Sequence, residues 1–207
     1  MQRDLFARSG PEVLVEHDGW ATLHRQWLPE VQAERLLSIF SDQLVWQQTV
    51  LRMYGKSMPI PRLNAWYGEP SAHYRYSGAS FTPKPWTAEL HTLRCQLEDF
   101  CECEFNSVLA NLYRDGRDSV AWHSDDEPEL GPEPTIASLS LGQTRHFTLR
   151  HKTSRHTCRV ALASGDLLLM GGRLQHHWQH QLVKSQRLLK PRINLTFRLV
   201  KPSVKDS

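Results

Sequence analysis

The chain has 207 residues, a formal net charge of +3, and apolar and charged fractions of 40% and 23%. This length suits one domain with its own buried core, so we expect residues 1–207 to form a single globular unit. No run of about 18 apolar residues could span a bilayer, and the N-terminus lacks the apolar stretch of a secretory signal. We therefore expect a soluble, cytoplasmic monomer, whose small positive charge is compatible with a polyanionic partner but does not require one.

Two segments of the N-terminal half have the apolar spacing of helices. The first opens at Pro29 and repeats apolar residues from Val31 to Leu44. The second opens at Pro85, and its apolar residues recur at intervals of four and three up to Phe100. Between them, residues 52–83 are rich in Tyr, Pro, Ser and Gly, which predicts a loop-dominated segment.

From about residue 106 the apolar period changes to two. Short runs bounded by Gly, Pro, Asp or Ser follow one another, and they are NSVLANLYR, IASLSL, RHFTLR, TCRVAL, DLLLM and RINLTFRLV. Several short strands at this spacing predict an antiparallel sandwich or a jelly-roll barrel, whose interior can hold a small ligand. We expect a mostly β fold, with helices in residues 1–105 and the jelly-roll core in residues 106–200.

The chain contains four cysteines, which are Cys95, Cys101, Cys103 and Cys158. They are too few for a disulfide scaffold, and their spacing is not that of a zinc ribbon. We interpret them as ordinary buried thiols in a reducing compartment.

The last predicted strand has one apolar face and one polar face. Alternation places four polar side chains together, and these are Arg192, Asn194, Thr196 and Arg198. A solvent-facing strand would show the same pattern. If the polar face points into a barrel instead, its two arginines need anionic partners, because a buried unpaired charge is very costly. A dicarboxylate ligand would satisfy both, and the planar guanidinium suits bidentate carboxylate binding.

Metal ligands are suggested by His123 and Asp125, which share one face of an extended segment. Two histidines and one carboxylate make the facial triad of non-haem Fe(II) oxygenases, so a second histidine is needed. In LQHHWQHQL, strand parity places His176 and His180 on the same side and does not choose between them. Further histidines lie in basic surroundings that disfavour a dication, namely His146, His151 and His156.

Asn111 and Tyr113 lie on one face of an earlier predicted strand, in NLYRDG. An amide and a phenol at these positions could hydrogen-bond an acidic ligand. A polar strand face close to a turn at Asp115 and Gly116 is the alternative interpretation.

Taken together and in order, NLYRDG, HSDDE, WQH and PRINLTFR resemble the AlkB family of Fe(II)/2-oxoglutarate dioxygenases over about 90 residues. The segment RINLTFR matches the family's R-x-N-x-T-x-R signature at every fixed position. Weaker similarity in MYGK, YRYSG and FTPKPW extends to the nucleotide-recognition region of the branch that repairs duplex DNA. The resemblance implies a double-stranded β-helix oxygenase core, with nucleotide recognition in the N-terminal half.

The resemblance also implies roles for the polar residues. His123, Asp125 and His180 would hold Fe(2+), with His180 preferred because the family's ligand follows the aromatic residue by two positions and His176 as the fallback. Arg192 and Asn194 would grip the far carboxylate of 2-oxoglutarate, and Arg198 would serve its keto-acid end. Three further residues would complete that pocket, and these are Asn111, Tyr113 and Thr196.

For the substrate, the resemblance places Tyr76 as a stacking wall opposite the His123 ring, with Tyr74 nearby and Asp126 reading the base edge. In MYGK, Tyr54, Gly55 and Lys56 stand where duplex-acting relatives insert an apolar finger, and a tyrosine there departs from the pattern. A basic predicted hairpin would meet phosphates or simply face solvent. Its charged residues are Arg145, Arg150, Lys152, Arg155 and Arg159.

The implied function is oxidative dealkylation of N-alkylated bases, of the 1-methyladenine and 3-methylcytosine type, in DNA. The co-substrates would be O2 and 2-oxoglutarate, which is decarboxylated to succinate, and the partner would be alkylated DNA. Two alternatives within the family are an RNA demethylase and a protein hydroxylase. From another class, the barrel could be a metal-free or zinc-bearing binding module, which dependence of turnover on iron and 2-oxoglutarate would distinguish.

Overall fold

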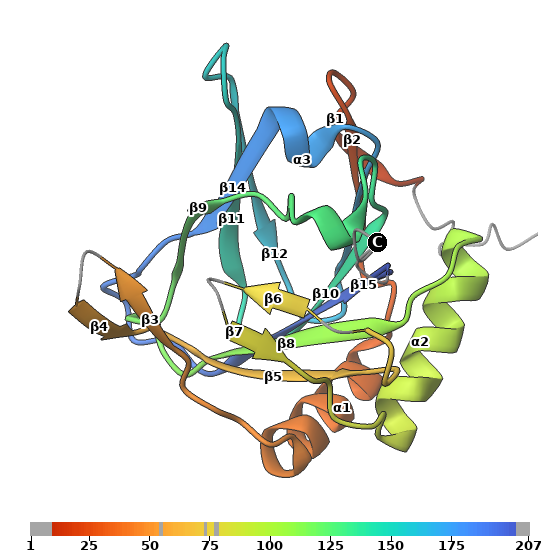
Figure 1. Cartoon of the computed structure of the whole chain (residues 1–207), viewed down its shortest axis with the longest axis vertical. Coiled ribbons are helices and arrows are strands. Elements are labelled where there is room, and N and C mark those ends of the chain that lie inside the picture. The colour runs from red at the N-terminus through yellow and green to blue at the C-terminus, as the bar shows by residue number, and fades with distance from the viewer. Residues whose placement is uncertain (1–9, 54–55, 73, 77–78, 202–207) are drawn as a thin grey trace, which may run out of the picture.

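The computed structural model describes residues 10–53, 56–72, 74–76 and 79–201, with the backbone alone described for 51–53, 56, 74–76 and 79–81. Its framework is two antiparallel sheets that face each other (Figure 1). The larger sheet has seven strands. In spatial order they are β1 (Glu12–Val15), β2 (Trp20–His24), β13 (Leu167–Gly171), β10 (Ile136–Gly142), β15 (Arg192–Arg198), β8 (Ser107–Tyr113) and β5 (Leu63–Gly68).

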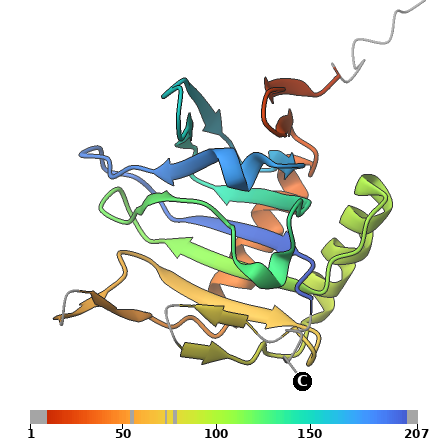
Figure 2. The same ribbon diagram turned by 45° about the horizontal axis from the view of Figure 1, so that its top comes forward.

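The smaller sheet has four strands, which are β12 (Thr157–Leu162), β11 (Arg145–His151), β14 (Trp178–Leu182) and β9 (Val120–His123) in spatial order. Two hairpins complete the described strands, β3 (Val50–Met53) with β4 (Lys56–Pro59) and β6 (Tyr74–Tyr76) with β7 (Ala79–Phe81). Figure 2 shows the strands side by side. The predicted jelly-roll fold, or double-stranded β-helix, is confirmed.

Helices α1 (Glu30–Gln43) and α2 (Ala88–Cys101) cover the outer face of the large sheet. The apolar stripe of α1 buries Ala33, Leu36 and Phe40. In α2, the Thr87 hydroxyl accepts a hydrogen bond from the Leu90 N–H at 3.2 Å, which caps the first turn. The second predicted helix therefore exists but begins at this cap, not at Pro85. Two short helices, η1 (Pro128–Leu130) and α3 (Leu174–His177), lie near the site described below.

Strand alternation divides the interior into two cores. Side chains on one face of the large sheet pack under α1 and α2, and Leu139, Leu195 and Phe197 are all fully buried there. Side chains on the other face pack against the small sheet, where Ile136 and Leu168 meet Phe147 and Leu149. The polar residues of β15 and β8 alternate with the first set, so they point into the space between the two sheets.

Residues 1–105 contribute more than helices and a recognition segment. Strands β1, β2 and β5 belong to the large sheet, since β2 pairs with β13 and β5 pairs with β8. The loop-dominated structure predicted for residues 52–83 is wrong, because this segment contains β4 to β7 and the end of β3. Its Tyr, Ser and Gly content obscured the alternation of these short strands.

The cysteines also differ from the expectation of buried thiols. Cys95 is exposed, and Cys101, Cys103 and Cys158 are partly exposed. All four are free thiols. Among the described residues, no helix is both long and apolar enough to span a bilayer.

Candidate active site

A cavity of about 160 Å³ lies between the two sheets. Part of its polar lining comes from the faces of β8 and β15 that point away from the helices, and the small sheet supplies the opposite wall. The predicted residues that line it are Asn111, Tyr113, His123, Asp125, His180, Arg192, Asn194, Thr196 and Arg198. Thus the polar face of β15 points inward, and the solvent-facing alternative is wrong.

His123 and His180 meet across the antiparallel pair β9–β14, where they are direct register partners. Their ring centroids are 4.3 Å apart. Asp125 follows β9 by two residues and brings its Oδ1 atom to 3.8 Å from His123 Nε2. One ligand atom from each of the three side chains lies within 4.8 Å of the others, so the trio can hold one metal ion. The structure does not bring His176 to this group, because its Nε2 atom contacts the Pro132 carbonyl at 2.7 Å.

Hydrogen bonds orient His123 and Asp125 for metal binding. His123 Nδ1 lies 2.9 Å from the Ala121 carbonyl, which can only accept, so Nδ1 carries the proton and Nε2 keeps its lone pair for a metal. The Asp125 backbone N–H donates to Gln175 Oε1 at 3.0 Å. Gln175 is itself buried, and it fixes the chain at the point where the carboxylate leaves it.

An arginine of β15 holds the carboxylate from the other side. Arg198 Nη2 donates to Asp125 Oδ2 at 2.8 Å, and both side chains are buried. Burial would raise the pKa of Asp125, but the adjacent Arg198 guanidinium opposes this effect, and that pKa lies well below its usual range. The carboxylate is therefore ionised at neutral pH, as a metal ligand must be. Arg198 was predicted to serve the keto-acid end of 2-oxoglutarate, and its contact here is with the carboxylate of the triad.

His180 is the most deeply buried of the three ligands, with 4% of its surface exposed. Burial, as the largest cause, lowers the pKa of His180 to about 3. A histidine binds a metal through its neutral form, so this ring needs no deprotonation at physiological pH.

Arg192 lies in the same cavity, at the opposite end of β15 from Arg198. It is only 2% exposed, and burial lowers its pKa to about 10. Its Nη2 donates to Ser140 Oγ at 2.9 Å, and the guanidinium lies over the Tyr113 ring at 5.4 Å from the centroid. The Nε and Nη1 atoms are buried and have no hydrogen-bond partner among the described residues. A buried cation with two unused donors fits an anionic ligand, and a carboxylate satisfies both donors at once.

The amides beside Arg192 are already engaged. Asn194 Nδ2 donates to Ser138 Oγ at 2.8 Å, and Asn194 Oδ1 accepts from the Thr196 hydroxyl at 3.1 Å. Asn111 Oδ1 accepts from Arg62 Nε at 2.8 Å. These residues therefore shape the cavity and fix its polar wall, while Arg192 keeps the free donors.

A family model described as "2OG-Fe(II) oxygenase superfamily" matches residues 21–198. The mouse protein "DNA oxidative demethylase ALKBH2" is 41% identical over 163 residues, covering 75% of this chain and 68% of the relative. The mouse "Alpha-ketoglutarate-dependent dioxygenase alkB homolog 3" is 42% identical over 181 residues, covering 83% of this chain. The chain belongs to the AlkB-type 2OG-Fe(II) oxygenases.

The match with AlkB-type proteins does not cover whole relatives. This chain spans 63% of the mouse alkB homolog 3 and also 63% of the bovine protein of that name, which is 47% identical over 181 residues. A solved structure titled "The structure of OsALKBH1" superposes with a TM-score of 0.58 at 20% identity, covering 86% of this chain and 97% of that one. This likeness supports the same fold.

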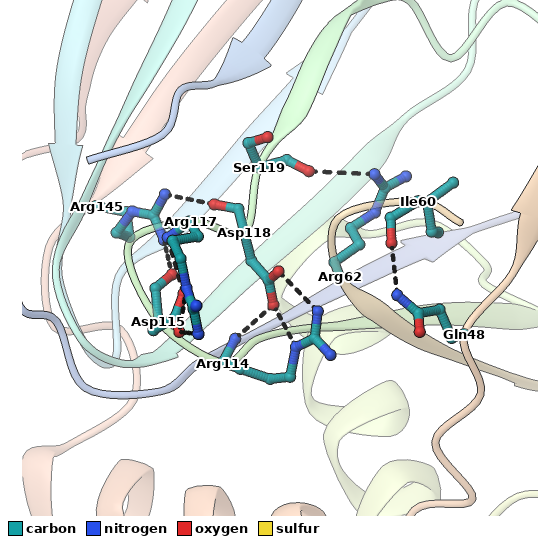
Figure 3. Close-up of polar contacts among 9 residues, drawn as sticks. All are labelled: Gln48, Ile60, Arg62, Arg114, Asp115, Arg117, Asp118, Ser119 and Arg145. Carbon is teal, nitrogen blue, oxygen red and sulfur yellow. Dashed lines mark hydrogen bonds and ion pairs between the residues drawn. The ribbon is translucent and has the colours of Figure 1, made fainter. Parts of the chain in front are cut away.

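The AlkB-type cavity also contains residues that the sequence analysis missed. Arg62 lines it between β4 and β5, and its Nη1 reaches the Ser119 carbonyl at 3.4 Å (Figure 3). Ser138 and Ser140 support Asn194 and Arg192, as described above. The alternation of Ser138 and Ser140 in IASLSL was a usable signal. Arg62 gave none, since it follows Pro61 in a segment that was predicted to be loop.

The basic hairpin β11–β12 is present, but its arginines do not all face solvent. Arg145 is buried and donates to the carbonyls of Asp115 and Asp118 (Figure 3). It also donates to the Val183 carbonyl, so both the phosphate contact and the solvent-facing position predicted for it are wrong. Arg150 lies over the Trp122 ring, 4.0 Å from its centroid. Exposed positions remain at Lys152, Arg155 and Arg159.

The structure describes the predicted substrate-binding residues less fully than the residues of the metal and 2-oxoglutarate sites. Tyr54 and Gly55 lie outside the described residues, and for Lys56, Tyr74 and Tyr76 only the backbone is described. Asp126 is exposed, lies 3.6 Å from Lys152 Nζ and is absent from the cavity lining, whereas its neighbour Glu127 lines the cavity. The structure therefore does not bring Asp126 to the three ligands.

Proposed function

We propose that this chain is an Fe(II)- and 2-oxoglutarate-dependent dioxygenase that removes alkyl groups from N-alkylated bases in DNA. One observation carries the proposal. The triad His123, Asp125 and His180 and the buried, incompletely paired guanidinium of Arg192 line the same cavity. A site that binds a cation at one end and an anion at the other fits a metal-chelating dicarboxylate.

The donor set fits iron, because two imidazoles and one carboxylate leave coordination positions open for a co-substrate and O2. When bound, the iron couples decarboxylation of 2-oxoglutarate to succinate with the transfer of one oxygen atom of O2 to a substrate C–H bond. The protein positions the reactants and controls their electrostatics. Arg192 would bind the far carboxylate of 2-oxoglutarate, and Ser140 and Tyr113 fix the guanidinium for that contact.

Arg198 would act on the metal ligand and not on the substrate. Its bond to Asp125 Oδ2 orients the carboxylate and keeps it ionised, which leaves Oδ1 facing His123. His180 remains neutral for the reason given above, and the Ala121 carbonyl fixes the tautomer of His123. All three ligands are thus prepared before metal binds.

The substrate class rests on the relatives. One of them is named a DNA oxidative demethylase, and this chain covers 68% of it. We infer a substrate of the 1-methyladenine or 3-methylcytosine type. Hydroxylation of the N-methyl carbon gives a hemiaminal, whose C–N bond breaks to release formaldehyde and the repaired base. A base in a duplex must first be flipped out, at a cost of a few kcal/mol that is smaller where the lesion has already broken the pair.

The test is aerobic incubation with Fe(II), ascorbate, 2-oxoglutarate and a 1-methyladenine oligonucleotide, in single- and double-stranded form. We expect methyl loss, formaldehyde and succinate in equal amounts, all absent in the Asp125→Ala variant. Succinate formation without methyl loss from DNA, but with loss from a methylated RNA, would transfer the proposal to RNA. Turnover only with a peptide substrate would indicate a protein hydroxylase, and no succinate from iron-loaded protein would overturn the dioxygenase.

A further inference from the structure

A second group of histidines and one carboxylate lies at the other end of the small sheet. It consists of Asp18 in the β1–β2 turn, His151 at the end of β11 and His177 in α3, and we call it the Asp18 cluster. One ligand atom from each lies within 4.8 Å of the others. Leu149 is the register partner of His180, and His151 that of Trp178, so the cluster lies beyond the first triad along β11 and β14.

His151 is buried and its proton is fixed by the backbone. Nδ1 accepts from the backbone N–H groups of Thr153 and Ser154, at 3.3 Å and 3.0 Å. The proton of the neutral ring is therefore on Nε2, which donates to Asp18 Oδ2 at 3.1 Å. This is the hydrogen bond by which a residue behind a metal ligand orients its carboxylate.

His177 carries the observation that points to a ligand. Its Nε2 atom is buried and has no hydrogen-bond partner among the described residues. The ring is stacked parallel to His151, with centroids 6.1 Å apart and 4° between the planes. A buried polar atom without a partner costs about 1–3 kcal/mol, so it is normally satisfied by something. One His177 ring nitrogen lies within 4.8 Å of an Asp18 carboxylate oxygen, which makes a cation a fitting partner for this ring.

A further nitrogen lies on the solvent side. His17 Nε2 is 3.1 Å from Asp18 Oδ2, and the His17 side chain is 84% exposed. Desolvation raises the pKa of Asp18. The hydrogen bond from His151 and the neighbouring histidines outweigh this effect and hold that pKa below its ordinary value. An aspartate carboxylate is charged at neutral pH with or without this shift, and it can serve as a ligand.

The turn that carries Asp18 is held in place. Trp178 Nε1 donates to the His17 carbonyl at 3.0 Å. Gly19 has φ +119°, and a Cβ there would lie 2.3 Å from the Leu174 nitrogen, so no other residue allows this close approach to α3. The nearby cation Lys152 is directed elsewhere, because its Nζ donates to the Gln175 carbonyl at 2.9 Å.

We propose that Asp18 and His177 bind a second divalent metal of the zinc class, with His151 orienting the carboxylate and the exposed His17 side chain turning in to complete the site. Nitrogen and oxygen ligands of this kind suit Zn²⁺, with water in the remaining position. The basic surroundings that argued against a dication at His151 in the sequence are offset by Asp18, which is distant in the chain. Bound metal would tie the β1–β2 turn to α3. The α3 ligand His177 lies three residues before His180 of the first triad.

The test counts zinc in protein whose first triad is disabled. The background variant His123→Ala/Asp125→Ala is stripped of metal, equilibrated with Zn²⁺ alone and analysed for zinc per chain after gel filtration. We expect one zinc in the background, none after adding His177→Ala, and one after adding the matched control His176→Ala on the exposed neighbouring histidine. No zinc in the background, or zinc retained with His177→Ala, would overturn the proposal.

A second variant guards against loss of structure in the alanine replacements. Asp18→Asn keeps an oxygen that accepts from His151 but removes the charge, and circular dichroism reports whether the fold is kept. Zinc is expected to raise the melting temperature of the background variant by several degrees and to leave that of the Asp18→Asn form unchanged. An equal rise in both would mean that zinc binds elsewhere.

Discussion

Among the described residues, two groups of two histidines and one carboxylate lie along the small sheet, and they differ in what surrounds them. In the first triad, Asp125 is paired with Arg198 and lines the cavity that contains Arg192. In the Asp18 cluster, the carboxylate is paired with histidines, and none of its three residues lines that cavity. Similar ligands therefore support different uses. The first triad lines a cavity that can hold a second reactant, so it suits catalysis. The Asp18 cluster does not line that cavity, so it suits a metal that holds segments of the chain together.

The largest expected difference between the two groups is in turnover. Asp125→Ala should lower demethylation by about 1000-fold or more, because a catalytic metal contributes several kcal/mol to the transition state. Asp18→Asn should leave the rate within about twofold, since a change outside the reacting centre removes no transition-state contact. Formaldehyde release under saturating 2-oxoglutarate measures both. Equal losses in the two variants would contradict the division of roles.

Next in size is the effect on the co-substrate. Arg192→Met should raise the KM for 2-oxoglutarate by about 100-fold, because losing one partner of a buried charge pair costs 2–5 kcal/mol. Arg159→Met, at an exposed position of the hairpin, is the matched control and should leave this KM unchanged. Succinate formation at varied 2-oxoglutarate provides both values. An unchanged KM in Arg192→Met would show that the far carboxylate of 2-oxoglutarate does not bind at this end of the cavity.

The turn of the Asp18 cluster offers a stability test. Gly19→Ala should lower the free energy of unfolding by about 2 kcal/mol or more, because the positive φ and the contact with Leu174 both strain the new side chain. Gly10→Ala is the control, since a Cβ there meets nothing within 4 Å. Urea unfolding compares the two. A stable Gly19→Ala protein would mean that the turn is not held against α3.

The smallest expected effect is the pH dependence of the first triad in metal-free protein. The pKa of His180 is lowered from 6.5 to about 3, so below pH 6.5 the unfolded chain binds a proton that the folded chain does not. Stability should therefore fall as the pH falls, by about 2 kcal/mol between pH 6.5 and 5. His180→Gln should lack this part of the decline in urea unfolding. An identical pH profile in both proteins would show that the ring is protonated in the fold.

Strand alternation made much of the site predictable from the sequence. In β15 the hydrophobic residues and the arginines occupy opposite faces, and a period of two is visible within a single segment. The ligands of the triad also lie in short motifs on two strands that pair directly. What the sequence could not supply was the tautomer of His123 and the partner of Arg198, because these depend on atoms brought together by folding.

Other features could not be predicted because they depend on distant contacts. Asp18 and His151 are separated by 133 positions and meet only when the β1–β2 turn folds against β11. Burial of Arg145 depends on carbonyls from two separate loops, so its sequence neighbourhood resembled an exposed basic hairpin. Local patterns identify the faces of strands, but they do not report which turns approach them.

The charges that line the cavity have a consequence for the order in which the site fills. They are three guanidinium groups and two carboxylates, from Arg62, Asp125, Glu127, Arg192 and Arg198, which leaves an excess of one positive charge. A divalent cation entering alone makes this excess larger, and a dianion entering alone reverses its sign. Each should therefore bind more tightly when the other is present, and thermodynamic reciprocity makes the two gains equal.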